Sequence, residues 1–282
     1  MKKILSKIIL LGLIVIMGLL LLSCESIPTT DICVSIPPQA YLVKRIAGKE
    51  TPVTIMIPPG SAPPTYAPTA AQIRSLHECK LYIKNGHPDF HFEQKHVNPF
   101  LNEHPEILTV SMADKMNIIP GDAHIWLSPL FMRTAANRIY AQLLTLYPHR
   151  EAELKSNLNR LVRDINILDR ELIGSLKDIQ GAEFLTLHPS WGYFARDYGI
   201  KQISIRHEHK GPSTQQLAKL MEHAKENNIH VIFVQKEFSS EPLELIAKEI
   251  GAEVIALDPL NENWLENMRN TGEALKKAMY VR

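Results

Sequence analysis

Residues 184–200 are FLTLHPSWGYFARDYGI, and this stretch decides how the rest of the chain is interpreted. The run 184–187 is mostly apolar, as in a short buried strand, and Pro189 ends the strand directly after His188. A short helix is predicted over 191–198. His188 should therefore lie at the carboxyl end of a parallel strand, where open α/β sheets bind ligands. One histidine in such a turn is more often a packing residue, so the interpretation depends on further candidate ligands.

Short apolar strands alternate with helices on both sides of this stretch, which predicts parallel sheets. The predicted strands are 31–36, 51–57, 80–84, 106–110, 183–187, 202–206, 230–235 and 253–257. Residues 148–178 carry leucine and isoleucine at helical spacing and predict one helix on the order of 45 Å long. A coiled-coil arm would also show this spacing. A rigid connector fits better, because α/β patterns lie on both sides.

The predicted fold is α/β, with two lobes that each contain a parallel sheet flanked by helices, joined by one long rigid connecting helix. The predicted division is a lipoprotein signal peptide at 1–23, a tether at 24–30, an N-terminal lobe at 31–147, the connecting helix at 148–180 and a C-terminal lobe at 181–282.

The first segment has the architecture of an export signal. Three lysines lie within residues 1–7 and precede an uncharged apolar core at 8–22. The residues LLSC at 21–24 resemble a bacterial lipobox, which implies cleavage before Cys24 and a lipid anchor on that cysteine. An uncleaved membrane span is the alternative, but the apolar core is shorter than the roughly 20 residues that a span prefers. The sequence thus predicts an exported, lipid-anchored protein that faces the periplasm or the extracellular side.

Composition excludes some partners and raises a question about two cysteines. The 282 residues carry 31 basic and 30 acidic side chains, a net charge of +1, so a nucleic-acid partner is not expected. Once Cys24 is acylated, Cys33 and Cys79 remain, each near the start of a predicted strand. If these strands are neighbours in an oxidising compartment, the two sulfurs can meet in a disulfide. The alternative is two buried, unreactive cysteines.

Three potential metal ligands follow strands or precede helices in similar fashion. They are His124, His188 and Asp258. Two imidazoles and a carboxylate suit a divalent transition metal, zinc above all. Asp258 by itself would more often be a turn or helix-cap residue.

Four motifs resemble, in order, those of the solute-binding lipoproteins of bacterial zinc/manganese ABC importers. They are SIPPQAYLVKRIAG at 35–48, HIWLSP at 124–129, HPSWGYFARDYG at 188–199 and LDPL at 257–260. The resemblance spans nearly all of the mature chain. It implies two α/β lobes joined by a long helix, with the metal in the cleft between the lobes.

The same resemblance implies a function and a set of ligands. The family's second, third and fourth ligands fall on His124, His188 and Asp258, and a histidine at 188 resembles the zinc-preferring members. The implied function is capture of Zn²⁺, or alternatively Mn²⁺, and its delivery to an ABC permease with its ATPase subunit. The resemblance further implies a monomer that is not an enzyme.

One departure from the family pattern concerns the first ligand. The family has a histidine before a Thr-Tyr-x-Pro stretch, whereas here Pro64 precedes 65–68 and has no side-chain lone pair. Three alternatives follow: water fills the fourth position, a nearby histidine such as His87 or His91 substitutes, or the site has lost metal binding. His207 and Glu208 are further candidates, either as ligands or as groups that hydrogen-bond a ligand imidazole.

Two other functions compete with metal transport. Two histidines, one aspartate and an open position are also how a hydrolytic zinc site is built, with Glu208 as a general base. No H-E-x-x-H motif is present, so a zinc hydrolase is the less favoured alternative. The substitution at Pro64 supports the other alternative, a degenerate surface lipoprotein or adhesin on the same scaffold.

Overall fold

The computed structural model of the chain describes residues 30–186, 188–204, 213–227, 229–235 and 241–280. The predicted signal peptide, Cys24 and all but the last residue of the predicted tether lie outside the described residues. Within the described ranges, none of the helices combines the length and the apolar character that crossing a bilayer requires.

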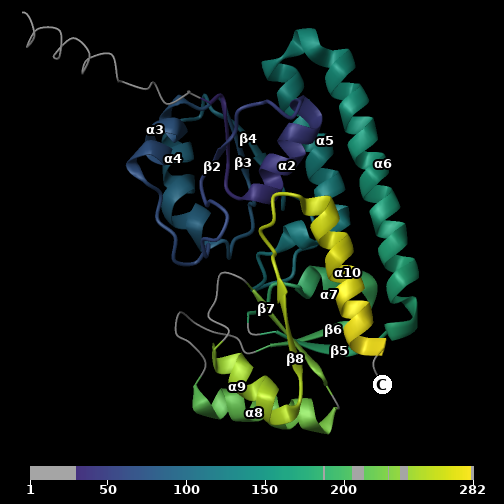
Figure 1. Ribbon diagram of the computed structural model, residues 1–282. Coiled ribbons are helices and arrows are strands. Elements are labelled where there is room, and N and C mark those ends of the chain that lie inside the picture. The colour runs from purple at the N-terminus through teal and green to yellow at the C-terminus, as the bar shows by residue number, and fades with distance from the viewer. Residues whose placement is uncertain (1–29, 187, 205–212, 228, 236–240, 281–282) are drawn as a thin grey trace, which may run out of the picture.

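The N-terminal lobe, drawn in purple to teal in Figure 1, is built on a sheet of four parallel strands, whose order is β2-β1-β3-β4. The strands are β1 (Ile32–Val34), β2 (Thr54–Ile55), β3 (Leu81–Lys84) and β4 (Leu108–Ser111). The helices of this lobe are α2 (Pro37–Ala47), α3 (Ala70–Glu78), α4 (Asn98–Glu103) and α5 (Pro129–Leu146). Strand β1 is buried along its whole length, as expected for a central strand covered on both faces.

The C-terminal lobe repeats this topology in a second parallel sheet, with the order β6-β5-β7-β8. Its strands are β5 (Glu183–Thr186), β6 (Lys201–Ser204), β7 (Val231–Gln235) and β8 (Glu253–Leu257), and its helices are α7 (Gly192–Tyr198), α8 (Thr214–Glu226), α9 (Glu241–Ile250) and α10 (Trp264–Tyr280). In each sheet the strand order reverses between the two central strands, which is where ligands of open α/β sheets bind. The segment that carries His188 follows β5, one of these central strands.

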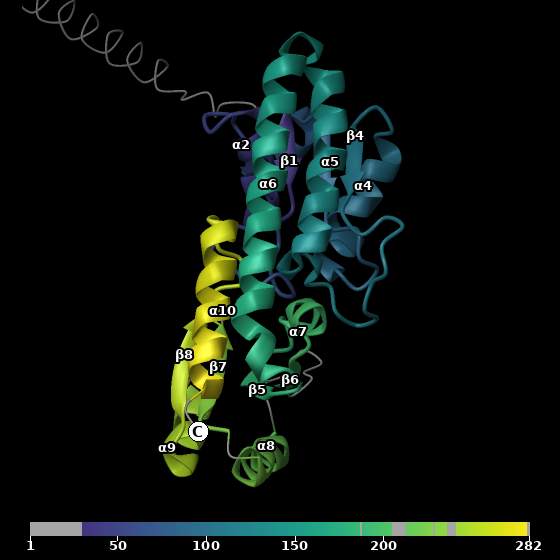
Figure 2. The same ribbon diagram turned by 90° about the vertical axis from the view of Figure 1, so that its right-hand side faces the viewer.

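One long helix, α6 (Glu151–Leu176), runs along both lobes (Figure 2). The leucine and isoleucine side chains at helical spacing are all buried, as the sequence predicts: Leu154, Leu158, Leu161, Ile165, Leu168, Leu172 and Leu176. They pack against α2 and α5 of the N-terminal lobe and against α10 of the C-terminal lobe. Ion pairs add to this packing, from Arg45 to Asp164 (2.6 Å) and from Arg269 to Glu171 (3.0 Å). The predicted fold class is therefore confirmed.

Both lobes contribute to one hydrophobic core. A single cluster of buried side chains extends from Ile32 in β1 through the buried face of α6 to Leu275 in α10. A smaller cluster lies under α8 and α9. The rings of Tyr41 in α2 and Trp264 in α10 are 6.3 Å apart between centroids, so helices from the two ends of the chain touch directly.

The helical segment at 91–103 is not one regular α-helix. Residues Glu93–Val97 form a π-helical turn, and α4 follows from Asn98. Pro99 is in the first turn of α4, where its missing N–H is tolerated, but a continuous α-helix from 90 would place it in the interior. The side chain of Glu93 points from this turn into the interior of the N-terminal lobe and is completely buried.

Glu93 lies between the carboxyl ends of β1 and β3. Its carboxylate accepts hydrogen bonds from the backbone N–H groups of Asn85 (2.6 Å) and Gly86 (2.9 Å), and from the hydroxyl of Ser35. These donors favour the ionised form, but burial opposes it more strongly and raises the pKa of Glu93 to about 7. The buried carboxylate thus holds together the loop ends on which the candidate site is built.

This burial predicts a pH dependence of stability. The pKa of Glu93 is higher in the folded chain than in the unfolded chain, so its contribution to stability is complete below about pH 4 and is lost as the pH rises through about 7. Between pH 5 and pH 8 the free energy of unfolding should fall by on the order of 2 kcal/mol more in the wild type than in Glu93→Gln. Urea unfolding of both proteins at the two pH values measures this, and equal pH dependence in both would contradict it.

Candidate metal centre

His124 is held in one orientation by Asp122. The Asp122 Oδ1 atom accepts hydrogen bonds from the His124 backbone N–H (2.9 Å) and lies 2.8 Å from His124 Nδ1. Because the carboxylate accepts, Nδ1 carries the proton and Nε2 keeps the lone pair that a metal requires. The His124 side chain is 18% exposed, so an ion can reach it from solvent. Sequence reasoning missed Asp122, although an acidic residue two positions before a candidate ligand was an available signal.

Asn85 fixes the loop that carries His124 through a hydrogen bond to the backbone of that loop. Asn85 follows β3 and is completely buried, and its side-chain amide donates to the carbonyl of Ala123 (2.8 Å). Gly86 has a φ of 78°, and a Cβ at this position would lie 1.9 Å from Ser111 Oγ, so the turn requires glycine. The pair Asn85-Gly86, which directly follows the predicted strand 80–84, thus positions the loop that carries His124.

The structure brings His188 and His124 together. Their ring centroids are 5.2 Å apart and the rings meet edge to face, with an interplanar angle of 77°. His188 follows β5 in the C-terminal lobe, whereas His124 precedes α5 in the N-terminal lobe. The pairing of these two histidines is thus a contact between side chains of different lobes.

Two buried tryptophans tie the loop that carries His124 to the turn that carries Asp258. Trp126 donates from Nε1 to the carbonyl of Pro259 (2.6 Å), and Trp264 donates from Nε1 to the carbonyl of Trp126 (2.7 Å). Both side chains are at most 1% exposed. Because Trp126 is two residues after His124 and Pro259 directly follows Asp258, these reciprocal bonds keep the predicted ligands of the two lobes in register.

Asp258 lies in the turn after β8, where its carboxylate organises the backbone. Oδ1 accepts from the Leu260 N–H (3.1 Å) and Oδ2 from the side-chain amide of Asn261 (3.2 Å). This is the turn role that the sequence offered as the alternative for Asp258. A carboxylate oxygen has more than one lone pair, so accepting these two bonds does not by itself prevent Asp258 from binding a cation.

His87 is placed as a structural residue. It is completely buried, its Nδ1 accepts from the Asp89 N–H (3.0 Å), and its Nε2 lies 3.1 Å from the carbonyl of Ile119. Because Nδ1 is an acceptor here, Nε2 carries the proton and donates. Both ring nitrogens are therefore occupied, and His87 has none to offer to a metal in this arrangement. His91 is exposed at the surface of the same lobe.

The remaining predicted residues do not complete a metal site in the part of the chain that the structure describes. His207 and Glu208 lie outside it. Pro64 lies in an exposed turn, in which the Thr65 and Tyr66 N–H groups donate to the carbonyl of Ala62 (3.1 Å each). Across the described ranges, histidine, cysteine and carboxylate side chains form no group of three or more placed to hold a metal ion. The three-residue set of His124, His188 and Asp258 therefore stays a prediction.

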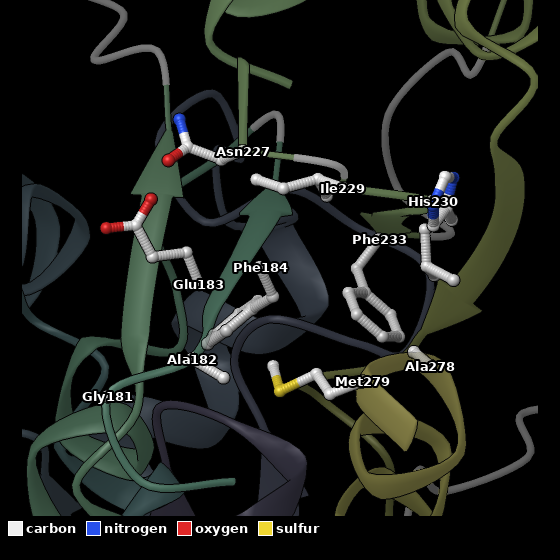
Figure 3. A pocket seen from close by; sticks show the side chains of 11 residues that line it. Gly181, Ala182, Glu183, Phe184, Asn227, Ile229, His230, Phe233, Ala278 and Met279 are labelled. Atoms are coloured by element: carbon white, nitrogen blue, oxygen red, sulfur yellow. The ribbon is translucent and has the colours of Figure 1, made fainter. Parts of the chain in front are cut away.

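A cavity of about 280 Å³ lies at the amino ends of the strands of the C-terminal sheet, opposite the end that carries His188 (Figure 3). It is lined by the amino ends of β5 and β7 and by the last turn of α10, and Phe184, Phe233 and Met279 form part of its wall. None of the predicted metal ligands lines it. The candidate centre is instead at the carboxyl end of β5.

Asp122→Asn tests the orientation of His124. An asparagine keeps the size of the side chain, but it no longer provides the charge that holds a proton on Nδ1 and raises the basicity of Nε2. We expect the affinity for Zn²⁺ to fall about 10–100-fold, with the fold retained. Competition against a chromophoric zinc chelator measures the change. An unaltered affinity would show that Asp122 does not act through His124.

Gly192 provides a second test, because it packs directly against Asp122. A Cβ at position 192 would lie 2.3 Å from Asp122 Oδ2, so Gly192→Ala has to displace the carboxylate that orients His124. We expect zinc affinity about tenfold lower. The matched control is Gly174→Ala in α6, where nothing lies within 4 Å of the added Cβ. The control should leave affinity unchanged and stabilise the helix by roughly 0.5–1 kcal/mol. Equal affinities in the two variants would contradict the prediction.

The fold and the paired imidazoles define a class of protein. Two α/β lobes on one long helix, with histidines from both lobes in contact at their junction, are the architecture of a metal-binding solute-binding protein. A family model described as "Zinc-uptake complex component A periplasmic" matches residues 32–278. The chain belongs to this family, whose members are transport components and not enzymes.

Individual relatives agree with this assignment. The chain is 25% identical over 274 residues to the "High-affinity zinc uptake system protein ZnuA" of Bacillus subtilis (strain 168), covering 87% of this chain and 86% of the relative. It is 24% identical over 295 residues to the "Zinc-binding lipoprotein AdcA" of Streptococcus pneumoniae serotype 4 (strain ATCC BAA-334 / TIGR4), covering 92% of this chain and 58% of that protein. A solved structure described as "Crystal structure of ZnuA" matches with a TM-score of 0.82 and 34% identity, covering 89% of this chain and 99% of the other.

Proposed function

We propose that the chain is the extracytoplasmic metal-binding component of an ABC importer, which captures Zn²⁺ between its lobes and delivers it to a permease. The observation that carries this proposal is the contact between His124 and His188, one from each lobe, with the Nδ1 of His124 already committed to Asp122. Membership of a zinc-uptake family supports zinc as the cargo.

The spacing of the two imidazoles suits a shared ion. A Zn–N bond of about 2.1 Å places the metal roughly 3.2 Å from the ring centroid, and two such rings at a tetrahedral angle have centroids about 5 Å apart. The centroids of His124 and His188 are 5.2 Å apart. The distance between the rings is thus compatible with both imidazoles binding one cation once a nitrogen of each ring points at it.

Asp258 is the proposed third ligand. The next residue, Pro259, accepts a hydrogen bond from Trp126, two residues after His124, and a carboxylate at 258 would offset part of the positive charge of the ion. The fourth position then falls to water or to a residue of the 207–208 segment, because Pro64 cannot coordinate and His87 has both ring nitrogens engaged. A water ligand would leave the ion exchangeable, which suits a protein that must release its cargo.

Location and partners complete the proposal. Lipidation of Cys24 would tether the domain outside the membrane, where it would meet, as a monomer, the permease of an importer whose ATPase subunit drives uptake. The proposed division of the mature chain is a tether at 24–30, lobes at 31–147 and 181–282, and the connector at 148–180. Anchoring keeps the cargo close to the permease and raises its effective concentration there.

Titration of the metal-free protein tests the proposal. The chain from residue 24 onward, with Cys24→Ser to prevent lipidation, is stripped with a chelator and titrated calorimetrically with Zn²⁺ and with Mn²⁺. We expect one Zn²⁺ per chain and a weaker response to Mn²⁺. Uptake of radioactive zinc by cells with and without the chain then tests delivery. Failure to bind either ion would overturn metal capture and would favour a surface lipoprotein that has lost its site.

A further inference from the structure

Two cysteines of the N-terminal lobe are not used by the proposed metal centre. Cys33 is in the middle of β1 and is completely buried, and Cys79 ends α3 and is 5% exposed. Both carry free thiols in this structure. The sequence leaves open whether the two sulfurs can meet. The positions of β1, β3 and α3 bear on this question.

The strands that carry the two residues are direct neighbours. Ile32 is paired with Leu81 in the parallel ladder between β1 and β3, and the N–H groups of Lys80 and Leu81 both donate to the carbonyl of Asp31 (2.8 and 3.0 Å). The chain therefore passes from Cys79 directly alongside the residues that precede Cys33.

The Cys33 side chain points to the helix from which Cys79 emerges. Its thiol donates to the carbonyl of Ser75 (3.5 Å), one turn before Cys79 in α3. The two thiols also interact with each other: a hydrogen bond with Cys79, together with burial, raises the pKa of Cys33 well above its usual value. The sulfur atoms are thus neighbours inside a close-packed core.

We propose that Cys33 and Cys79 form an intramolecular disulfide in the exported protein, closing the loop of residues 33–79 that contains the proline-rich segment around Pro64. The proposal rests on the extracytoplasmic location within the proposed function, since such a compartment is oxidising. It adds a covalent bond between β1 and α3, the helix that follows the position of the family's missing first ligand.

The chemistry requires a disulfide oxidant. A thiolate of one cysteine attacks the S–S bond of the oxidant and releases one of its sulfurs as a thiolate; the second cysteine then displaces the other from the mixed disulfide. The cysteine pair loses two protons and two electrons, and the oxidant is reduced to two thiols. A thiol–disulfide oxidoreductase of the exported compartment can serve, as can glutathione disulfide in vitro.

Burial decides when the bond forms. A thiol with a raised pKa is rarely ionised, so exchange in the folded protein is slow. The bond should form while the chain folds and the thiols are accessible, and the same burial then shields it from reductants.

Thiol counting tests the proposal. The Cys24→Ser chain, which keeps only Cys33 and Cys79, is refolded with glutathione disulfide and assayed under denaturing conditions. We expect no free thiol before reduction, two afterwards, and an intact mass lighter by two hydrogen atoms than that of the reduced chain. Two free thiols, or glutathione adducts on separate cysteines, would overturn it.

Thermal unfolding provides an independent readout. Reduction under denaturing conditions followed by refolding should lower the midpoint by roughly 5–15 °C, because the open chain regains conformational freedom. A matched variant with Cys33→Ala and Cys79→Ala should not respond to reductant. Zinc affinity should be the same with the bond open or closed, so failure of the disulfide leaves the proposed transport function untouched, and failure of zinc binding leaves the disulfide untouched. An unchanged midpoint after verified reduction would show that no stabilising bond had formed.

Discussion

Replacing His124 or His188 by alanine is expected to lower the affinity for Zn²⁺ by more than about 100-fold. Losing a residue that supports a metal ligand typically costs 10–100-fold, so losing the ligand itself should cost more. Each variant leaves one imidazole, which cannot hold the ion between the lobes. Calorimetric titration of the metal-free variants, beside the wild type at the same pH, measures the loss.

His149→Ala is the matched control for these substitutions. His149 is exposed in the turn before α6, at the N-terminal end of the connector, and takes no part in the contact between His124 and His188. Its affinity for Zn²⁺ should equal that of the wild type. Circular dichroism should show all three variants folded. Wild-type affinity in either His124→Ala or His188→Ala would rule out the shared ion and with it the proposed capture mechanism.

Trp264→Ala should have the largest effect on stability. The Trp264 side chain is completely buried, contacts Tyr41 of α2 and donates to the carbonyl of Trp126. Alanine would leave a cavity at the junction of the lobes and an unpaired buried carbonyl. We expect a loss of about 3–5 kcal/mol in the free energy of unfolding, measured by urea denaturation.

Two further variants separate the causes. Trp264→Phe fills most of the volume but removes the donor, so it should cost only about 1–3 kcal/mol. Ile173→Ala in α6 removes a side chain that is 55% exposed and should change stability by no more than about 0.5 kcal/mol. If Trp264→Ala unfolds at the same urea concentration as Ile173→Ala, the tryptophan pair does not hold the lobes together.

Much of the fold follows from patterns that local physics enforces. The seven buried side chains of α6 recur at helical spacing, and each predicted strand is a short apolar run between turn signals. Tertiary contacts determine the features of the fold that these local patterns could not predict. The identical strand order of the two sheets leaves no mark in the sequence, because parallel pairing joins segments that are distant in the chain.

The candidate site was only partly predictable, since the sequence identifies ligand types but not what surrounds them. His124 and His188 were found, and the structure places them in contact. His87 looked like a substitute ligand, but the carbonyl of Ile119 and the Asp89 N–H occupy its ring. That arrangement depends on a loop 32 residues further along the chain, which no local pattern reveals.

The core that both lobes share has a consequence for biogenesis. The cluster that begins at Ile32 is completed by Trp264 and Leu275 in the last helix. For an exported chain, those residues leave the translocation channel after the rest of this core. We therefore expect the polypeptide to stay unfolded until α10 has emerged. An unfolded chain can pass through the channel, and its two thiols are still accessible to oxidants when it arrives. A nascent chain truncated before residue 264 should accordingly remain sensitive to protease.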